Sequence, residues 1–388
     1  MLKIQVKILF ILFFLLVQKT SLFSQSHQDL KIGILSGTRT SSLKFVGVSG
    51  KYDVISGGSK IISADPSIRL ELSINPMGIE LKYQERVMGV YNDIQIVGVD
   101  TGNSLKIKTS GSNRMMAYDG NFKISKQGNF FKMINMVNLE DYVTTVMESE
   151  AGNSSLMEYL KLQAILCRTF THKNAGKHLA DGFDLCDKVH CQVYGEKKRT
   201  NPLILQAVKM TKGKVVVDKN NQIILSAYHS NCGGQTINSE DVWNTPLPYL
   251  RSVKDSFCQS QPHAYWKEKI PVKAWDSRYA EHDQKQIQDT FNQVCYNYTP
   301  KARECIVPYK GKNLQLKNVR TDWGLKSTYF TINEKKDTLF LTGRGFGHGV
   351  GLCQEGAMKM VTRGYTYEQI LRYYYKNVSI AFVDSIFN

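Results

Sequence analysis

Residues 138–150, "NLEDYVTTVMESE", mark the point where the sequence changes from a strand pattern to a helix pattern. Asn138, with Asp141 three residues further on, is typical of a helix N-cap. Apolar residues then recur at helical spacing, at Leu139, Tyr142, Val143, Val146 and Met147. Strand patterns precede this segment and helix patterns follow it. This segregation of strands and helices predicts an α+β fold.

The chain before this segment reads as a series of short strands. Runs such as "LKIGIL", "RLELSI" and "IELKY" are separated by Gly, Ser, Asn and Asp, which is typical of β-hairpins. We therefore expect a β-rich region over residues 26–136 and a mixed helical and antiparallel-strand catalytic domain over residues 137–388. Within the latter we expect helices opened by the Ser155/Glu158 and Thr366/Gln369 capping boxes, and another over residues 283–294.

Residues 1–25 have the features of a secretory signal peptide. Lys3 and Lys7 precede an apolar run of ten residues from Ile8 to Val17, and small polar residues follow to Gln25. An uncleaved anchor is disfavoured, because a bilayer core needs about 20 apolar residues. No later run is long and apolar enough to cross a membrane. We expect a secreted or periplasmic protein of the cell envelope, with no membrane span after cleavage.

The chain is strongly basic. Its 388 residues include 50 Lys and Arg against 34 Asp and Glu, a formal charge of +16, which favours polyanionic partners. Export and the lack of a helix-turn-helix or aromatic RNA-binding motif exclude nucleic acid. Acidic polysaccharide and anionic lipid surfaces remain as partner classes.

Glu150 is the candidate general acid. Continuing the apolar stripe of residues 139–147 by its own spacing reaches Glu150, whereas Glu148 is expected to point away. Removal of a carboxyl group from water raises its pKa, as a general acid near neutral pH requires. The alternative is a helix that ends at Glu148 and leaves Glu150 exposed in a turn.

Five motifs follow one another along the chain: "LEDYVTTVMESE" (139–150), "YLKLQAILCRTF" (159–170), "CQVYGE" (191–196), "AYHSNCGGQT" (227–236) with "VWNTPLPYL" (242–250), and "GRGFGHGVGLCQEGA" (343–357). The motifs and their order resemble the stage II sporulation protein D family, which includes the amidase enhancers. The chain departs from the family pattern at Ala151 and Gly152, where methionine and proline are usual. It departs again at Cys353 and Glu355, in place of a small residue and an aromatic.

The resemblance implies a lytic transglycosylase that cleaves peptidoglycan glycan strands, preferably strands without stem peptides. Glu150 aligns with the family's catalytic glutamate, and no cofactor is required for the chemistry, which leaves 1,6-anhydro ends. Denuded strands expose lactyl carboxylates, which suits the basic chain. The motifs also supply the expected substrate-binding residues, which are Arg168, Gln192, Tyr194, His229, Ser230, Gly233, Gly234, Arg344, His348 and Gln354.

Two other functions remain as alternatives. One is a non-catalytic peptidoglycan-binding module that enhances a cell-wall amidase, as the name of some family members implies. The other is a thiol amidase or protease with Cys191 or Cys353 as nucleophile. The thiol enzyme is disfavoured, because His190 adjoins Cys191 and neighbours in a strand point to opposite faces.

Glycine occupies every second position from Gly343 to Gly351. Such alternation marks close approach to the backbone. One interpretation places an extended sugar strand along this bare face, with Arg344, His348 and Gln354 bonding it from the edge. The other is a tight turn with a buried, structural His348.

His178, Cys186, His190 and Cys191 lie within 14 residues and suit a tetrahedral zinc ion. Some members of the resembled family carry such a structural zinc at this place. His172 could replace His178, and a disulfide that uses Cys186 is the competing interpretation. The even number of eight cysteines in an exported chain suggests disulfides, and Cys232 is either free or paired to Cys258.

Overall fold

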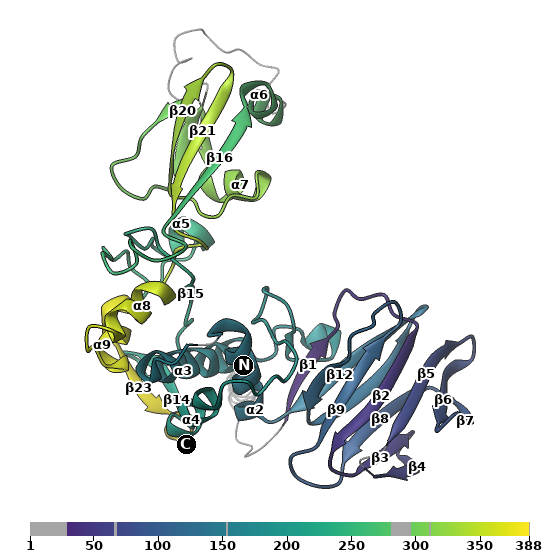
Figure 1. The fold of residues 1–388 in the computed structure, drawn as a ribbon. Helices are drawn as coiled ribbons and strands as arrows, with labels where there is room; N and C mark the ends of the chain where they lie inside the picture. The colour runs from purple at the N-terminus through teal and green to yellow at the C-terminus, as the bar shows by residue number, and fades with distance from the viewer. Residues whose placement is uncertain (1–28, 66–67, 153, 281–295, 310–311, 388) are drawn as a thin grey trace, which may run out of the picture. The chain divides into compact units, whose positions relative to one another are not determined.

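The computed structural model describes residues 29–65, 68–152, 154–280, 296–309 and 312–387 (Figure 1). The predicted signal peptide and the predicted helix over residues 283–294 lie outside these ranges. The chain forms two compact units. The first holds the described residues up to Ser154, Cys167–Val215 and the C-terminal end from Ala381, and the second holds Ser155–Leu166 and Val216–Ile380. The domain boundary expected at residue 137 stays a prediction.

Two sheets make up the β-rich part of the first unit. The seven-stranded sheet has the order β13 (Leu185–Cys186), β1 (Leu30–Ile34), β12 (Phe130–Val137), β11 (Asn121–Gln127), β8 (Asp93–Gly98), β3 (Tyr52–Ser56), β4 (Ser59–Ala64). The six-stranded sheet has the order β10 (Met116–Asp119), β9 (Ser104–Thr109), β2 (Ser42–Ser49), β5 (Arg69–Asn75), β6 (Gly78–Tyr83), β7 (Arg86–Tyr91).

Alternation along these strands buries one face of each sheet. Ile94 and Ile96 on β8 are fully buried, as are Leu70 and Leu72 on β5. The ring of Phe45 on β2 meets that of Phe122 on β11 edge-on, with 6.2 Å between centroids. The two sheets therefore share an apolar core, and the N-terminal region is β-rich as predicted.

Helices follow the last long strand, as predicted. They are α2 (Leu139–Glu150), α3 (Met157–Asn174), the 3₁₀ turn η1 (Leu179–Asp181) and α4 (Pro202–Met210), and strand β14 (Lys214–Asp218) comes next. The Asn138 side chain accepts from the Glu140 N–H, which confirms the N-cap of α2. Gly152, with φ +57°, lies just beyond the end of α2, in the left-handed conformation that glycine favours there.

Strand β13 fixes the loop that follows α3 to the sheet. It pairs parallel with β1, with Ile32 opposite Leu185 and Gly33 opposite Cys186. The Asp184 carboxylate accepts from the Lys31 N–H at 2.9 Å. Strand β13 is thus an edge strand of the larger sheet, and it attaches the cysteine and histidine segment to that sheet.

The second unit contains a four-stranded antiparallel sheet and several short helices. The sheet has the order β16 (Tyr265–Pro271), β21 (Thr338–Arg344), β20 (Phe330–Lys335), β17 (Asn297–Tyr298). Its core includes Trp275, Phe330 and Ile332. The remaining elements are β15 (Tyr228–His229), which pairs with β22 (Leu352–Cys353), α5 (Glu240–Trp243), α6 (Val272–Ala280), the hairpin β18 (Ile306–Tyr309) and β19 (Lys312–Gln315), α7 (Leu316–Asp322), α8 (Gln354–Val361) and α9 (Tyr367–Tyr374).

Strand β23 (Val378–Phe382) and helix α10 (Asp384–Phe387) end the chain, and the fold class is α+β as predicted. The capping box of Thr366 and Gln369 is confirmed at α9. Glu158 was expected in a capping box with Ser155. Its carboxylate accepts from the Tyr367 N–H and pairs with Lys161. Over the described residues, no helix is long and apolar enough to cross a membrane.

Candidate active site and metal clusters

Glu150 is the last residue of α2 and is half-buried. Burial raises the pKa of its carboxyl group, while a hydrogen bond from the Val193 N–H, 3.4 Å from Oε1, acts in the opposite direction. No lysine or arginine in the described part of the chain forms an ion pair with Glu150. The side chain therefore holds a proton more strongly than an exposed glutamate does.

The expectation that Glu148 points away from the core is wrong. Its side chain is 2% exposed and pairs with Arg199 at 3.5 Å, and it accepts from the Lys198 N–H at 3.0 Å. The reason is that α2 is buried on most of its surface, from Tyr142 to Glu148, so its buried face is wider than one stripe. Two neighbouring carboxyl groups thus differ in electrostatic surroundings, since only Glu148 forms an ion pair with a cation in the part of the chain that the structure describes.

The segment after Cys191 packs directly on the end of α2. The ring of Tyr194 stacks on that of Tyr142 with 5.0 Å between centroids, and its hydroxyl donates to Asn135 at 2.7 Å. A Cβ on Gly195 would lie 2.8 Å from Ser149 Oγ, so the backbone approaches closely here. This packing positions the Val193 N–H next to the Glu150 carboxyl group.

Gln192 and Tyr194 are buried within this packing and are not exposed for a sugar. The Gln192 Oε1 accepts from the hydroxyls of Tyr142 at 3.4 Å and Thr171 at 3.1 Å. Their expected role in substrate binding is therefore corrected to one of positioning Val193. The physical reason is that both side chains point inward on the two sides of the residue that contacts Glu150.

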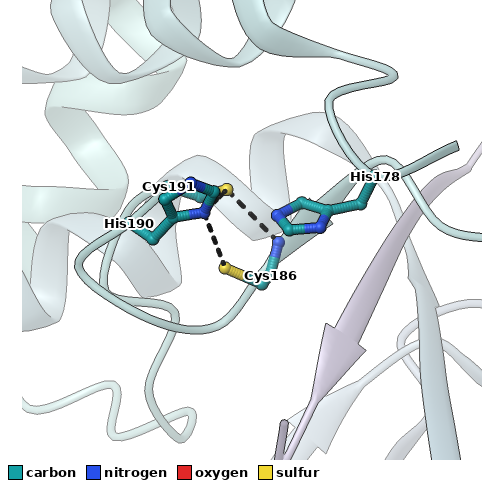
Figure 2. A group of neighbouring side chains, drawn as sticks. All are labelled: His178, Cys186, His190 and Cys191. Carbon is teal, nitrogen blue, oxygen red and sulfur yellow. Dashed lines mark hydrogen bonds between the residues drawn. The ribbon is translucent and has the colours of Figure 1, made fainter. Parts of the chain in front are cut away.

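His178, Cys186, His190 and Cys191 converge in space, as Figure 2 shows. One ligand atom from each lies within 4.8 Å of the others. The His190 Nδ1 is 3.8 Å from each of the two sulfurs. The His178 Nδ1 is 2.9 Å from the Asp181 carboxylate, and its Nε2 is buried without a hydrogen-bond partner.

This donor set fits a zinc-type ion. Two thiols and two imidazoles are common tetrahedral ligands, and a carboxylate on the far nitrogen of a ligating histidine fixes its orientation. The buried Nε2 of His178 has no hydrogen-bond partner among the described residues, so this nitrogen is available to bind such an ion. His172 is not a member of the converging group, so His178 fills the place for which both were candidates.

Known proteins have sequences similar to this part of the chain. A family model described as stage II sporulation protein matches residues 127–217, which include Glu150 and the cysteine and histidine group. Stage II sporulation protein D of Bacillus subtilis is 30% identical over 312 residues, which cover 74% of this chain and 87% of that protein.

The chain belongs to the stage II sporulation protein D family. The amidase enhancer of Bacillus subtilis is 27% identical over 346 residues, covering 72% of this chain and 47% of that protein. An uncharacterised protein of Brachyspira hyodysenteriae is 30% identical over 83% of this chain and 84% of its own length.

The arginine of the second family motif is internal. Arg168 is fully buried, and its guanidinium donates to both Glu140 carboxylate oxygens, at 2.9 and 2.6 Å, and to the Lys214 carbonyl at 3.1 Å. A sugar has no access to it. Its expected role in substrate binding is corrected to that of a tie between α3 and the first turn of α2.

The space beside the alternating glycines of the last family motif is occupied by other residues of the second unit. A Cβ on Gly343 would lie 1.9 Å from the Trp266 ring, and one on Gly347 would lie 2.8 Å from the His229 Cβ. At Gly349 and Gly351 it would meet the Arg303 guanidinium and the Ala227 carbonyl. The interpretation of this bare face as a track for a sugar strand is therefore wrong, because the close approach is intramolecular.

The second interpretation of this motif, with a structural histidine, describes His348 correctly. Its Nε2 donates to the Tyr228 carbonyl at 3.0 Å, and its Nδ1 accepts from the Val350 N–H at 3.0 Å. Burial lowers the pKa of His348 to about 4. The ring is therefore neutral and fully hydrogen-bonded, and its expected contact with sugar is not available.

The remaining residues expected to bind substrate differ in exposure. Arg344 is exposed, with its guanidinium 5.0 Å from the Tyr329 ring centroid. His229 and Gln354 are buried, so their side chains are not exposed for a sugar, although their Nε2 atoms have no hydrogen-bond partner in the described chain. Ser230, Gly233 and Gly234 lie on the loop that follows β15.

Two features of the sites were missed in the sequence. Arg199 reaches Glu148 from 51 residues further along the chain, and nothing in its local sequence marks it. A second converging group, Cys232, Asp255, Cys258 and Cys353, lies in the second unit. The first and last of these are 121 residues apart, and the even cysteine count was the only signal for them.

Replacement of Arg168 by methionine should reduce stability and leave ligand binding by the folded protein unchanged. Loss of the buried partner of Glu140 should cost about 3 kcal/mol, as measured by urea unfolding. The exposed Arg86→Met change is the matched control and should have little effect. Unchanged stability together with lost glycan binding would restore Arg168 as a substrate residue.

Acid should destabilise the second unit through His348. Its folded-state pKa of about 4 lies below the ordinary 6.5, so its contribution is present above pH 6.5 and is lost as pH falls toward 4. The loss should reach about 3 kcal/mol, because protonated Nδ1 faces the Val350 N–H. The melting temperature of His348→Gln should depend less steeply on pH over this range. Equal slopes would contradict the structural role.

Proposed function

We propose that the chain is an exported peptidoglycan lytic transglycosylase of the cell envelope, with Glu150 as its general acid and base. The observation that carries this proposal is the half-buried Glu150 carboxyl group, whose pKa burial raises and which forms no ion pair with a cation of the described residues. The nearby Glu148 differs from it in forming an ion pair with Arg199. A proton available near neutral pH is what cleavage of a glycosidic bond demands of an acid.

The reaction needs one carboxyl group. Glu150 gives its proton to the glycosidic oxygen between muramic acid and glucosamine while the bond from muramic C1 to that oxygen breaks. The resulting carboxylate takes the proton of the C6 hydroxyl of the same muramic acid, and O6 forms a bond to C1. The products are a 1,6-anhydro end and a free glucosamine hydroxyl, and no water is consumed. The Val193 N–H holds the carboxylate in place between the two proton transfers.

The substrate class follows from charge. Glycan strands without stem peptides carry a lactyl carboxylate on each muramic acid, and the chain has a formal charge of +16. Within the second unit, the exposed Arg344 is the proposed contact to the charged glycan. Ser230, Gly233 and Gly234 would shape the loop that carries His229.

We also propose that His178, Cys186, His190 and Cys191 hold a structural zinc ion. The ion would act as a cross-link in a loop that has little regular structure of its own. Cys191 is two residues before Val193, so fixing the cysteine also fixes the N–H that contacts Glu150. Because burial raises the pKa of the Cys191 thiol to about 11, a bound cation is what would keep this sulfur ionised at neutral pH.

A second candidate function is supported by the relative named amidase enhancer. In this alternative the chain binds the wall and stimulates a cell-wall amidase without cleaving glycan strands. The basic charge and the polar groups of the second unit would serve both functions. Only the transglycosylase requires the proton of Glu150.

Replacement of Glu150 by glutamine should reduce the formation of anhydro-muramic ends at least about 100-fold. The measurement is mass spectrometry of the products from purified protein and denuded glycan strands. The exposed Glu85→Gln change, in the same unit, is the matched control and should keep full activity. Wild-type activity should fall as pH rises through the pKa of Glu150, because the acid must be protonated.

Stability distinguishes a catalytic from a structural Glu150. The raised pKa means that the folded wild type loses stability as pH rises through that pKa, and Glu150→Gln removes this loss. The glutamine oxygen can still accept from Val193. The variant should therefore be at least as stable as the wild type at pH 7. Glycans that are bound but uncleaved by the wild type would favour the enhancer.

Replacement of Cys186 and Cys191 by serine should remove one equivalent of zinc, measured by elemental analysis of protein purified with reductant. Catalytic activity should fall with the metal, since the Val193 segment loses its anchor. Cys305, which is outside both converging groups and half-buried, provides the Cys305→Ser control. Zinc binding should weaken as pH falls, because the thiols must lose protons. An unchanged zinc content would show that the four residues do not bind it.

A further inference from the structure

A second group of ligand-type side chains lies within the second unit. Cys232, Asp255, Cys258 and Cys353 are all buried, and one ligand atom from each lies within 4.8 Å of the others. We propose that these residues form a second metal site, for a zinc-type divalent cation. The proposal is independent of the function proposed for Glu150, because Glu150 belongs to the first unit and these four residues belong to the second.

The spacing of the donors matches a tetrahedral site. The sulfurs of Cys232 and Cys258 are 3.3 Å apart, and the Cys232 sulfur is 3.2 Å from the Asp255 Oδ2. Zinc ligands at about 2.3 Å for sulfur and 2.0 Å for oxygen would place two sulfurs about 3.8 Å apart and a sulfur and an oxygen about 3.5 Å apart. Small side-chain adjustments therefore suffice to enclose an ion between the three sulfurs and the carboxylate.

Charge is the second argument. Asp255 is fully buried beside three thiols, and no lysine or arginine of the described chain forms an ion pair with it. A buried carboxylate without a cationic partner is costly. A divalent cation would neutralise Asp255 and the thiolates together. The Tyr374 hydroxyl, 2.8 Å from Oδ2, and the Phe257 N–H, 2.8 Å from Oδ1, fix the carboxylate from outside, as supporting residues of metal ligands do.

Backbone N–H groups also point at the sulfurs. The Cys353 sulfur accepts from the N–H groups of Cys232 at 3.3 Å and Gly356 at 3.4 Å. A Cβ on Gly356 would lie 2.4 Å from the Asp255 Oδ2 and 2.2 Å from the Tyr374 hydroxyl. The backbone is therefore shaped around the carboxylate and the sulfur. Such donors stabilise negative charge on sulfur, which a metal-bound thiolate carries.

A disulfide between Cys232 and Cys258 accounts for less of this arrangement. It would use two sulfurs and leave the Cys353 thiol and the Asp255 carboxylate buried beside it. A cation uses all four donors. It would also join the loop after β15 to the start of α8, where Cys353 is the N-cap residue. The glycine-rich segment 343–351 runs directly into that cap, so the ion would fix its C-terminal end.

The first measurement is the metal content of the full chain, purified with reductant and zinc. Two equivalents are expected, one for each group. Cys353→Ser and Asp255→Asn should each lose one equivalent, and the Cys305→Ser control should lose none. The double variant Cys186→Ser with Cys191→Ser should keep the equivalent that belongs to this site. A zinc content that does not change in the Cys353 and Asp255 variants would overturn the proposal.

A second measurement does not depend on how well the Cys353 and Asp255 variants fold. Cobalt added to the Cys186→Ser, Cys191→Ser protein should give the absorption bands of thiolate-bound cobalt, since three thiols remain in the second group. Absence of these bands overturns the proposal. Peptide mapping of the wild type under non-reducing conditions should recover Cys232 and Cys258 as free thiols. A disulfide between them in zinc-loaded protein also overturns it.

Discussion

The packing of residues 191–195 against the end of α2 is the constraint on which the candidate active site depends. Tyr194 stacks on Tyr142, and Gly195 allows the backbone to approach Ser149. Between them, the Val193 N–H meets the Glu150 carboxylate. The segment has almost no regular hydrogen bonding of its own, so its position comes from side-chain packing on one side and the cysteine and histidine group on the other.

Electrostatics then separates two carboxyl groups of one helix turn. Glu148 is the more deeply buried, yet Arg199 and the Lys198 N–H compensate its charge. Glu150 is less buried but has no cationic partner among the described residues, so burial acts on its pKa with little opposition. Depth of burial alone does not distinguish Glu150 as the candidate acid. The difference between the two comes from which of them the loop after the cysteine and histidine group supplies with a positive charge.

Each unit contains one group of converging ligand-type side chains. In the first, two thiols and two imidazoles converge, and Cys186 among them belongs to β13, the strand that ties the loop to the sheet. In the second, three thiols and a carboxylate gather beside the start of α8. Both groups join segments that regular secondary structure does not connect. A cation suits this purpose, because it takes donors from several directions at once, whereas a disulfide joins only two.

Local sequence patterns determined the fold class, the strands before residue 137 and the N-cap at Asn138, and they indicated Glu150 as a candidate acid, because all of these depend on spacing along the chain. The motifs with their family resemblance indicated the cysteine and histidine group, whose members are close in sequence. Tertiary structure alone decided the rest. The partner of Glu148 and the enclosure of Arg168 depend on contacts between distant residues. The alternating glycines suggested a ligand surface, because their sequence indicates that other atoms approach the backbone closely. The sequence does not show that the side chains of Trp266, His229 and Arg303 are those atoms.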